Sequence, residues 1–188
     1  MLGQQVLGGH GYIAEWGLEQ NVRDARISQI YEGANGIQAL DLMGRKTVRS
    51  NGELLGILFE EMEGFIESSK HIEPLAEGLT KLESLMGELK QATNTVIEKA
   101  KNDPDEIGAA SYPYMELMGL TLFCFMWQRI LASVHLAKVN NDGSEDYLNG
   151  LLGSGDFFMN RLLPKSKTLL EEIQAGSKSL MVVTADQF

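Results

Sequence analysis

The sequence predicts an all-α protein, an antiparallel helical bundle preceded by two further helices. Apolar residues recur at intervals of three and four along most of the 188 residues, as they do on one face of a helix. Alternation with a period of two, which is typical of strands, is confined to one short C-terminal candidate, residues 179–184. Glycines, prolines and capping residues divide the apolar repeats into segments of helical length.

The first of the two leading helices is expected within residues 14–31. Apolar side chains from Trp16 to Ile30 have a rough helical spacing, and Gly33 would end the helix. On this helix, Arg23 and Asp24 are expected to form a structural ion pair. A compact motif, Tyr31-Glu32-Gly33-Ala34, therefore forms an elbow between the two leading helices.

The second leading helix is expected to begin at Asn35, a candidate N-cap, with an apolar face from Ile37 to Val48. A break follows at residues 50–52, Ser-Asn-Gly. We place a domain boundary there, between residues 1–50 and 52–188. We expect residues 52–188 to fold cooperatively without residues 1–50.

Four or so helices are expected after the boundary. Residues 54–66 carry one wide apolar stripe, and residues 79–100 repeat apolar side chains at alternating spacings of three and four. Asp103-Pro104 resembles a helix start for a third helix that runs to about Val139. We expect Pro113 to kink this helix or to delay its start.

The remaining segment contains many glycines and a second proline. Residues 140–155 are expected to form a loop with one short helix at about 147–152. A last helix would begin at Asp156, be kinked or divided at Pro164, and end at Gly176.

Composition excludes several classes of protein. The hydrophobic share of 44% with 22% charged residues is that of a globular protein, and a net charge of −10 argues against a nucleic-acid surface. The longest apolar stretch, residues 114–137, is interrupted by polar and charged residues, so we expect a central buried helix and no membrane span. Cys124 is the only cysteine, which favours a buried, inert thiol and an intracellular, cytoplasmic location. The three histidines are too dispersed for a metal site.

A glycine-rich turn, residues 8–12, precedes the first helix. Gly9, Gly11 and Ala14 superficially match a dinucleotide-binding fingerprint, but only residues 4–7 could form the preceding strand and no acidic residue follows at the required place. We therefore reject that interpretation. A plain glycine turn between two helices is the simplest alternative.

Residues 4–45 resemble the C-terminal signature of the acyl-CoA dehydrogenases, flavoenzymes that oxidise an acyl-CoA thioester to its 2-enoyl form. The residues that carry the resemblance are Gln5, Gly8, Gly9, Gly11, Tyr12, Arg23, Asp24, Tyr31, Glu32 and Gly33. The resemblance implies that Glu32 is the base that removes the α-proton, and that its backbone N–H helps to hold the thioester carbonyl, with Gly33 permitting the close approach. Abstraction of that proton needs a carboxylate held in a dry place near the carbon atom.

The same resemblance implies that Gln5, Gly8 and Gly9 contact the adenosine-diphosphate half of FAD, which in the family belongs to the neighbouring subunit. Further implications are a homodimer or dimer of dimers and electron transfer to an electron-transfer flavoprotein. Ala34 and Gly36 depart from the family pattern, because many relatives carry a hydroxyl and a longer polar side chain there.

Residues 52–188 resemble, more weakly, the additional C-terminal helical domain of a large-subunit branch of the family, through residues 156–164 and 174–176. The N-terminal helical domain and the middle β-domain of the family have no counterpart here. We therefore expect a C-terminal fragment that by itself binds no flavin and is inactive. The alternative is a stand-alone helical interaction module whose first fifty residues only resemble the enzyme.

Overall fold

The computed structural model describes residues 2–187, and within these residues it contains helices and turns but no strand. The all-α prediction is confirmed. The described residues form two compact units that divide between Ala39 and Leu40. This division falls before the boundary predicted at residues 50–52, which stays a prediction about domain organisation.

The first unit consists of short helical segments joined by tight turns. They are α1 (Leu2–Val6), η1 (Gly8–Tyr12), η2 (Ala14–Trp16), α2 (Leu18–Ser28), η3 (Tyr31–Gly33) and most of α3 (Ala34–Leu40). Large apolar side chains are extensively exposed along this unit: Leu2, Val6, Tyr12, Trp16, Ile27, Ile30, Tyr31 and Ile37. The unit therefore presents an apolar surface that a monomeric protein rarely leaves uncovered.

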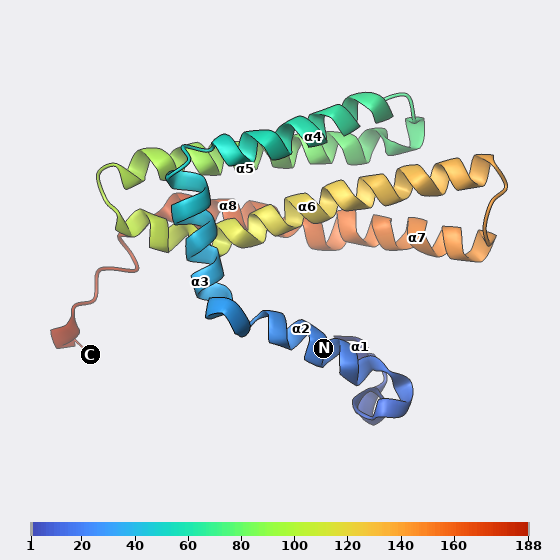
Figure 1. Cartoon of the computed structure of the whole chain (residues 1–188), viewed down its shortest axis with the longest axis horizontal. Coiled ribbons are helices and arrows are strands. Elements are labelled where there is room, and N and C mark those ends of the chain that lie inside the picture. The colour runs from blue at the N-terminus through green and yellow to red at the C-terminus, as the bar shows by residue number, and fades with distance from the viewer. Residues whose placement is uncertain (1, 188) are drawn as a thin grey trace. The chain divides into compact units, whose positions relative to one another are not determined.

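The second unit is the predicted antiparallel bundle. Its elements are η4 (Asp41–Val48), α4 (Glu53–Ser69), η5 (Glu73–Leu75), α5 (Ala76–Ala100), α6 (Asp105–Val139), α7 (Glu145–Phe157), η6 (Phe158–Leu162), η7 (Leu163–Lys165), α8 (Ser166–Ala175) and η8 (Ala185–Gln187). In Figure 1, α4 and α5 form one antiparallel hairpin and α6 and α7 form another, with α8 beside α6. The break at residues 50–52 is confirmed, because Asn51 and Gly52 make a turn with positive φ.

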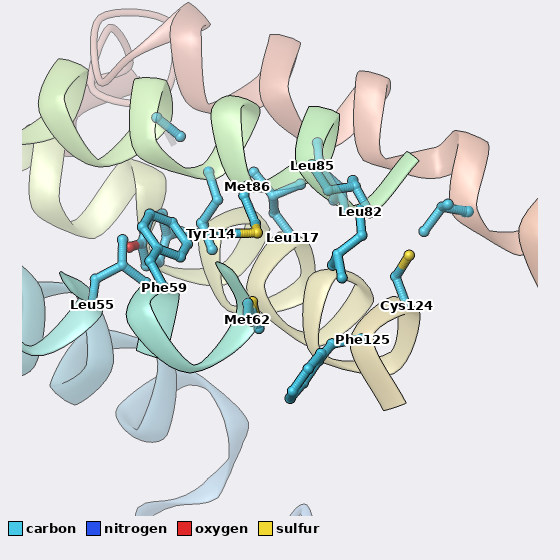
Figure 2. Close-up of a cluster of buried hydrophobic side chains, with 14 of the residues drawn as sticks. Leu55, Phe59, Met62, Leu82, Leu85, Met86, Tyr114, Leu117, Cys124 and Phe125 are labelled. Atoms are coloured by element: carbon cyan, nitrogen blue, oxygen red, sulfur yellow. The ribbon is translucent and has the colours of Figure 1, made fainter. Parts of the chain in front are cut away.

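The core of the bundle is built from buried faces of α4, α5 and α6, to which η4, η5, η6, η7 and α8 add further buried side chains. Figure 2 shows some of these side chains meeting, among them Phe59 and Met62 from α4 and Leu82 from α5. One polar pair lies inside, where the Tyr114 and Thr93 hydroxyls are 2.8 Å apart. Burial raises the pKa of the Tyr114 hydroxyl.

The predicted burial of Cys124 is confirmed. Its side chain is fully buried, and burial raises the pKa of the thiol to about 12. Because the thiolate is the reactive form, this cysteine is inert in the folded protein.

Helix α6 is the one helix in residues 2–187 that is long and apolar enough to cross a membrane by length and composition alone. It packs against α5, α7 and α8 as the central helix of the bundle. The buried residues along it include Tyr114, Leu117 and Phe125. The central position of the predicted helix fits this packing, although only part of the helix is buried.

One helix boundary was predicted wrongly: the helix after the elbow begins at Ala34, so Asn35 lies within it and is not its N-cap. Pro113 does not delay α6, which begins at Asp105 and continues through the proline, and the alternative of a kink at Pro113 stays a prediction. The weak strand candidate, residues 179–184, contains a turn and irregular backbone, with the Leu180 N–H donating to the Ser177 carbonyl.

The expected loop at residues 140–155 is mostly helix, because α7 begins at Glu145 and continues to Phe157. Of the three glycines in α7, Gly155 permits close packing on α6. A Cβ atom at Gly155 would lie 3.0 Å from a methyl group of Leu131. The predicted division at Pro164 is confirmed, since η7 separates α7 and η6 from α8, and Gly176 ends α8 with a φ of 73°.

We predict that residues 40–188 fold cooperatively without residues 1–39. The core cluster runs from Met43 to Ile173 and lies wholly within this segment. Residues 52–188 should also fold but be less stable by roughly 2–5 kcal/mol, because removal of the fully buried Met43 leaves a cavity. Thermal and urea unfolding of the two truncated proteins measures both effects. Equal stability of the two would show that η4 is not part of the core.

Candidate functional site

The elbow between α2 and α3 has an unusual backbone. Three successive residues have positive φ: Glu32 at 54°, Gly33 at 102° and Ala34 at 56°. Residues with a Cβ atom rarely adopt this conformation, and it occurs preferentially where a functional site needs a particular side-chain direction. The elbow thus holds the exposed Glu32 side chain outside the regular face of either helix.

Gly33 is required by the geometry of this elbow. A Cβ atom at this position would lie 2.7 Å from the Cγ2 atom of Ile37, which is too close for two carbon atoms. Its φ of 102° also disfavours any other residue. The glycine that follows the carboxylate therefore fixes the turn and keeps the backbone beside Glu32 uncovered.

Gln38, which lies in the next helix, stabilises the elbow, and no pattern in the sequence predicts this role. The Nε2 atom of Gln38 donates a hydrogen bond to the Glu32 carbonyl oxygen at 2.6 Å. This bond connects α3 to the residue that carries the candidate base. Its sequence signal is weak, because a pair separated by six residues across a turn follows no helical periodicity.

The glycine-rich turn lies at the other end of α2. Gly8 has a φ of 56°, and a Cβ atom at Gly8 or Gly9 would meet no atom of the chain within 4 Å. Gln5, at the end of α1, is exposed beside this turn. Gly11 is different, because a Cβ atom there would overlap the backbone of Gln4. The turn is therefore tightly closed on one side and open to a ligand on the other.

The structure does not bring Glu32 and the glycine turn into one cluster. Helix α2 separates them, and its 11 residues span about 16 Å. Gln5, Gly8 and Gly9 on one side and Glu32 with Gly33 on the other remain predicted site residues.

Arg23 does not pair with Asp24 as predicted. Its guanidinium pairs with Glu19, one turn earlier, with 3.0 Å between Nε and Oε2. Residues that are adjacent in a helix point in different directions, whereas residues four apart lie on the same face. Arg23 therefore contributes to α2 and makes no contact at the elbow.

The structure also argues against the dinucleotide-binding interpretation. The segment before the glycines is the helix α1, and the strand that the fingerprint requires is missing from residues 2–187. Within the same residues, His, Cys, Asp and Glu side chains form no cluster of three that could hold a metal ion.

Comparison with known proteins matches two consecutive segments to families. Residues 2–46 match the acyl-CoA dehydrogenase C-terminal domain, and residues 58–184 match the family described as acetyl-CoA dehydrogenase C-terminal like. The first match contains both the glycine turn and the elbow. The second contains almost all of the bundle.

Individual relatives agree with these matches. A 3-methylmercaptopropionyl-CoA dehydrogenase from Ruegeria pomeroyi is 30% identical over 97% of this chain and 31% of its own length. A broad-specificity linear acyl-CoA dehydrogenase from Mycobacterium tuberculosis is 28% identical over 94% of this chain and 30% of its own length. The human short-chain specific acyl-CoA dehydrogenase is 52% identical over 40 residues, which are 21% of this chain and 10% of that protein.

The chain spans a little under a third of the length of the first two relatives. The match to the C-terminal-like family covers more than half of the chain, and the match to the C-terminal domain directly precedes it. The chain therefore belongs to the acyl-CoA dehydrogenase family and corresponds to its C-terminal part.

Proposed function

We propose that this chain is the C-terminal part of an FAD-dependent acyl-CoA dehydrogenase in which Glu32 is the catalytic base. The observation that carries the proposal is the elbow itself. Its backbone has positive φ at three successive residues, and the first of them, Glu32, carries the exposed carboxylate. A strained turn that exposes a single acidic side chain is typical of a catalytic position.

The chemistry assigned to Glu32 is removal of the α-proton of an acyl-CoA thioester. The carboxylate accepts the proton while the backbone N–H of Glu32 binds the thioester carbonyl oxygen and stabilises the charge that develops there. FAD, when bound, would supply the acceptor for the β-hydride. Gly33 permits the close approach of the thioester to the backbone, and the Gln38 hydrogen bond keeps the elbow in position.

The open side of the glycine turn fits the second part of the proposal. Because no atom of the chain occupies the space beside Gly8 and Gly9, the phosphates of FAD can approach the backbone there. Gln5 supplies a side-chain amide at the edge of the same turn. In this proposal, Gln5, Gly8 and Gly9 hold the adenosine-diphosphate half of a flavin that belongs to the neighbouring subunit.

The apolar surface of the first unit supports a larger assembly. Trp16, Ile27, Ile30 and Tyr31 are each more than half exposed, which is unfavourable unless further protein covers them. We propose that the rest of the catalytic core and a second subunit do so, in a homodimer or dimer of dimers. An electron-transfer flavoprotein is the proposed acceptor of the electrons.

The stand-alone interaction module is the rival interpretation. The match of residues 2–46 to the C-terminal domain of the enzymes favours the enzyme, because the matched segment contains the elbow and the glycine turn together. An interaction module would need neither a strained carboxylate turn nor an open glycine turn.

We predict that the purified 188-residue chain is colourless and oxidises no acyl-CoA, whereas the same sequence joined to the other two domains of the family carries FAD. The physical reason is that the glycine turn supplies contacts to one end of the flavin only. Visible absorbance and the FAD-to-protein ratio of both preparations measure this. A stoichiometric flavin on the 188-residue chain would contradict the proposal, and so would a joined protein that holds flavin yet does not bleach with any saturated acyl-CoA.

A further inference from the structure

A polar cleft of about 190 Å³ lies within the bundle, between α5, α6 and α7, apart from the elbow and the glycine turn. The residues that define its chemistry are Gly78 and Lys81 from α5, Gln128 and His135 from α6, Asp156 from α7 and Asn160 from η6. The cleft belongs entirely to the second unit, for which the acyl-CoA chemistry assigns no ligand.

Gln128 is the unusual residue in this cleft. Its side chain is only 1% exposed, yet its Oε1 atom has no hydrogen-bond partner among the described residues. The Nε2 atom makes only a weak contact, at 3.9 Å from the sulfur of Met159. Buried side-chain oxygens in native proteins nearly always accept a hydrogen bond, so this oxygen is a candidate acceptor for a donor from outside the chain, such as a ligand or a water molecule.

Gly78 makes room for the Gln128 amide. A Cβ atom at Gly78 would overlap this amide, so the amide occupies its place only because no side chain is present on α5 there. Glycine is a poor helix former, and glutamine is rarely buried without partners. Two unfavourable residues in direct contact at the cleft indicate that the position of this amide has a purpose beyond packing.

The one ammonium group of the cleft is already engaged. Lys81 pairs with Glu77 at 2.8 Å and donates to the Oδ1 atom of Asn160 at 3.2 Å. The Nδ2 atom of Asn160 in turn donates to one carboxylate oxygen of Asp156 at 2.8 Å. The second Asp156 oxygen and the Gln128 Oε1 atom accept no hydrogen bond from a described residue, and the two carboxylates of Glu77 and Asp156 outnumber the ammonium group. The cleft therefore complements a positively charged hydrogen-bond donor.

We propose that this cleft binds a small organic cation with N–H donors, a primary ammonium or guanidinium group that donates to the Gln128 Oε1 atom. The Asp156 carboxylate supplies the opposite charge, and the volume suits a head group of a few heavy atoms. The site is independent of the proposed dehydrogenase chemistry, because it involves neither Glu32 nor the glycine turn.

The direct test is a titration of the ¹⁵N-labelled 188-residue chain with methylammonium, followed by NMR. Methylammonium should produce saturable shifts of the Gln128 side-chain amide and the Gly78 and Gly155 backbone amides. Tetramethylammonium carries the same charge without an N–H donor and should not produce them. Shifts that do not saturate, or that both cations produce equally, would overturn the proposal.

Two substitutions locate the site. Gln128→Leu retains the volume but removes the acceptor, and should weaken methylammonium binding about tenfold or more. Asp156→Asn on the exposed end of α7 should weaken binding as well, whereas its matched control Asp146→Asn, on the same helix outside the cleft, should leave the affinity unchanged. Undiminished affinity in Asp156→Asn, or an equal loss in Asp146→Asn, would reject the site even if Gln128→Leu fails to fold.

Discussion

Replacement of Glu32 by Gln in the full-length enzyme should abolish measurable flavin bleaching by a saturated acyl-CoA. Glutamine retains the size and hydrogen-bonding capacity of the side chain but removes the basic carboxylate, so the α-proton stays on the thioester. Removal of a general base lowers the rate by ~10²–10⁴-fold. Stopped-flow absorbance of the bound flavin after mixing with substrate measures this loss.

The matched control is Glu15→Gln, which changes an exposed glutamate of the same unit, in η2 rather than at the elbow. It should bleach at the wild-type rate. Affinity for a non-reactive acyl-CoA analogue should be nearly normal in both variants. A Glu32→Gln enzyme that bleaches like the wild type would place the base elsewhere in the protein.

Replacement of Leu82 by Ala should give the largest loss of stability among single core truncations on α5. Leu82 is fully buried and belongs to the core cluster, part of which Figure 2 shows. Leucine-to-alanine changes at such positions cost roughly 2–5 kcal/mol of unfolding free energy through lost burial and the cavity that remains. For a protein of this size, we expect the melting temperature to fall by about 5–15 °C.

Leu136→Ala is the control for this substitution, because Leu136 also lies on a long helix but is 63% exposed. Its unfolding free energy should change by less than about 0.5 kcal/mol. Differential scanning calorimetry and urea unfolding of both variants provide the comparison. If the two variants unfold alike, the faces of α5 and α6 are assigned wrongly.

The long helices of the bundle could be predicted from the sequence because their apolar residues follow a helical period. The stripe from Leu55 to Ile66 corresponds to the buried face of α4, and the glycine turn at Gly52 ends the preceding segment as expected. The elbow was identified from a different signal, because Tyr31-Glu32-Gly33 is part of a short sequence motif. Both signals are local, and local signals can be recognised in one sequence.

The features that the sequence did not predict depend on contacts between distant residues. The glycines of residues 140–155 predict a loop with one short helix at about 147–152, whereas α7 is longer, and its packing on Leu131 accounts for the glycine at position 155. The Gln38 side chain donates to the Glu32 carbonyl across a turn. The positive φ of Glu32 in this turn is not evident from the sequence. The unpaired oxygen of Gln128 is likewise invisible until α5 is placed against α6.

The glycines of α7 also have a consequence for the order of folding. A segment that contains Gly150, Gly153 and Gly155 has little tendency to become helical by itself, because each glycine costs about 1 kcal/mol relative to alanine. Its helix becomes stable only when the surface of α6 is already available. In the folding transition state, α5 and α6 should therefore be largely formed while α7 is not, and substitutions in α7 should mainly accelerate unfolding.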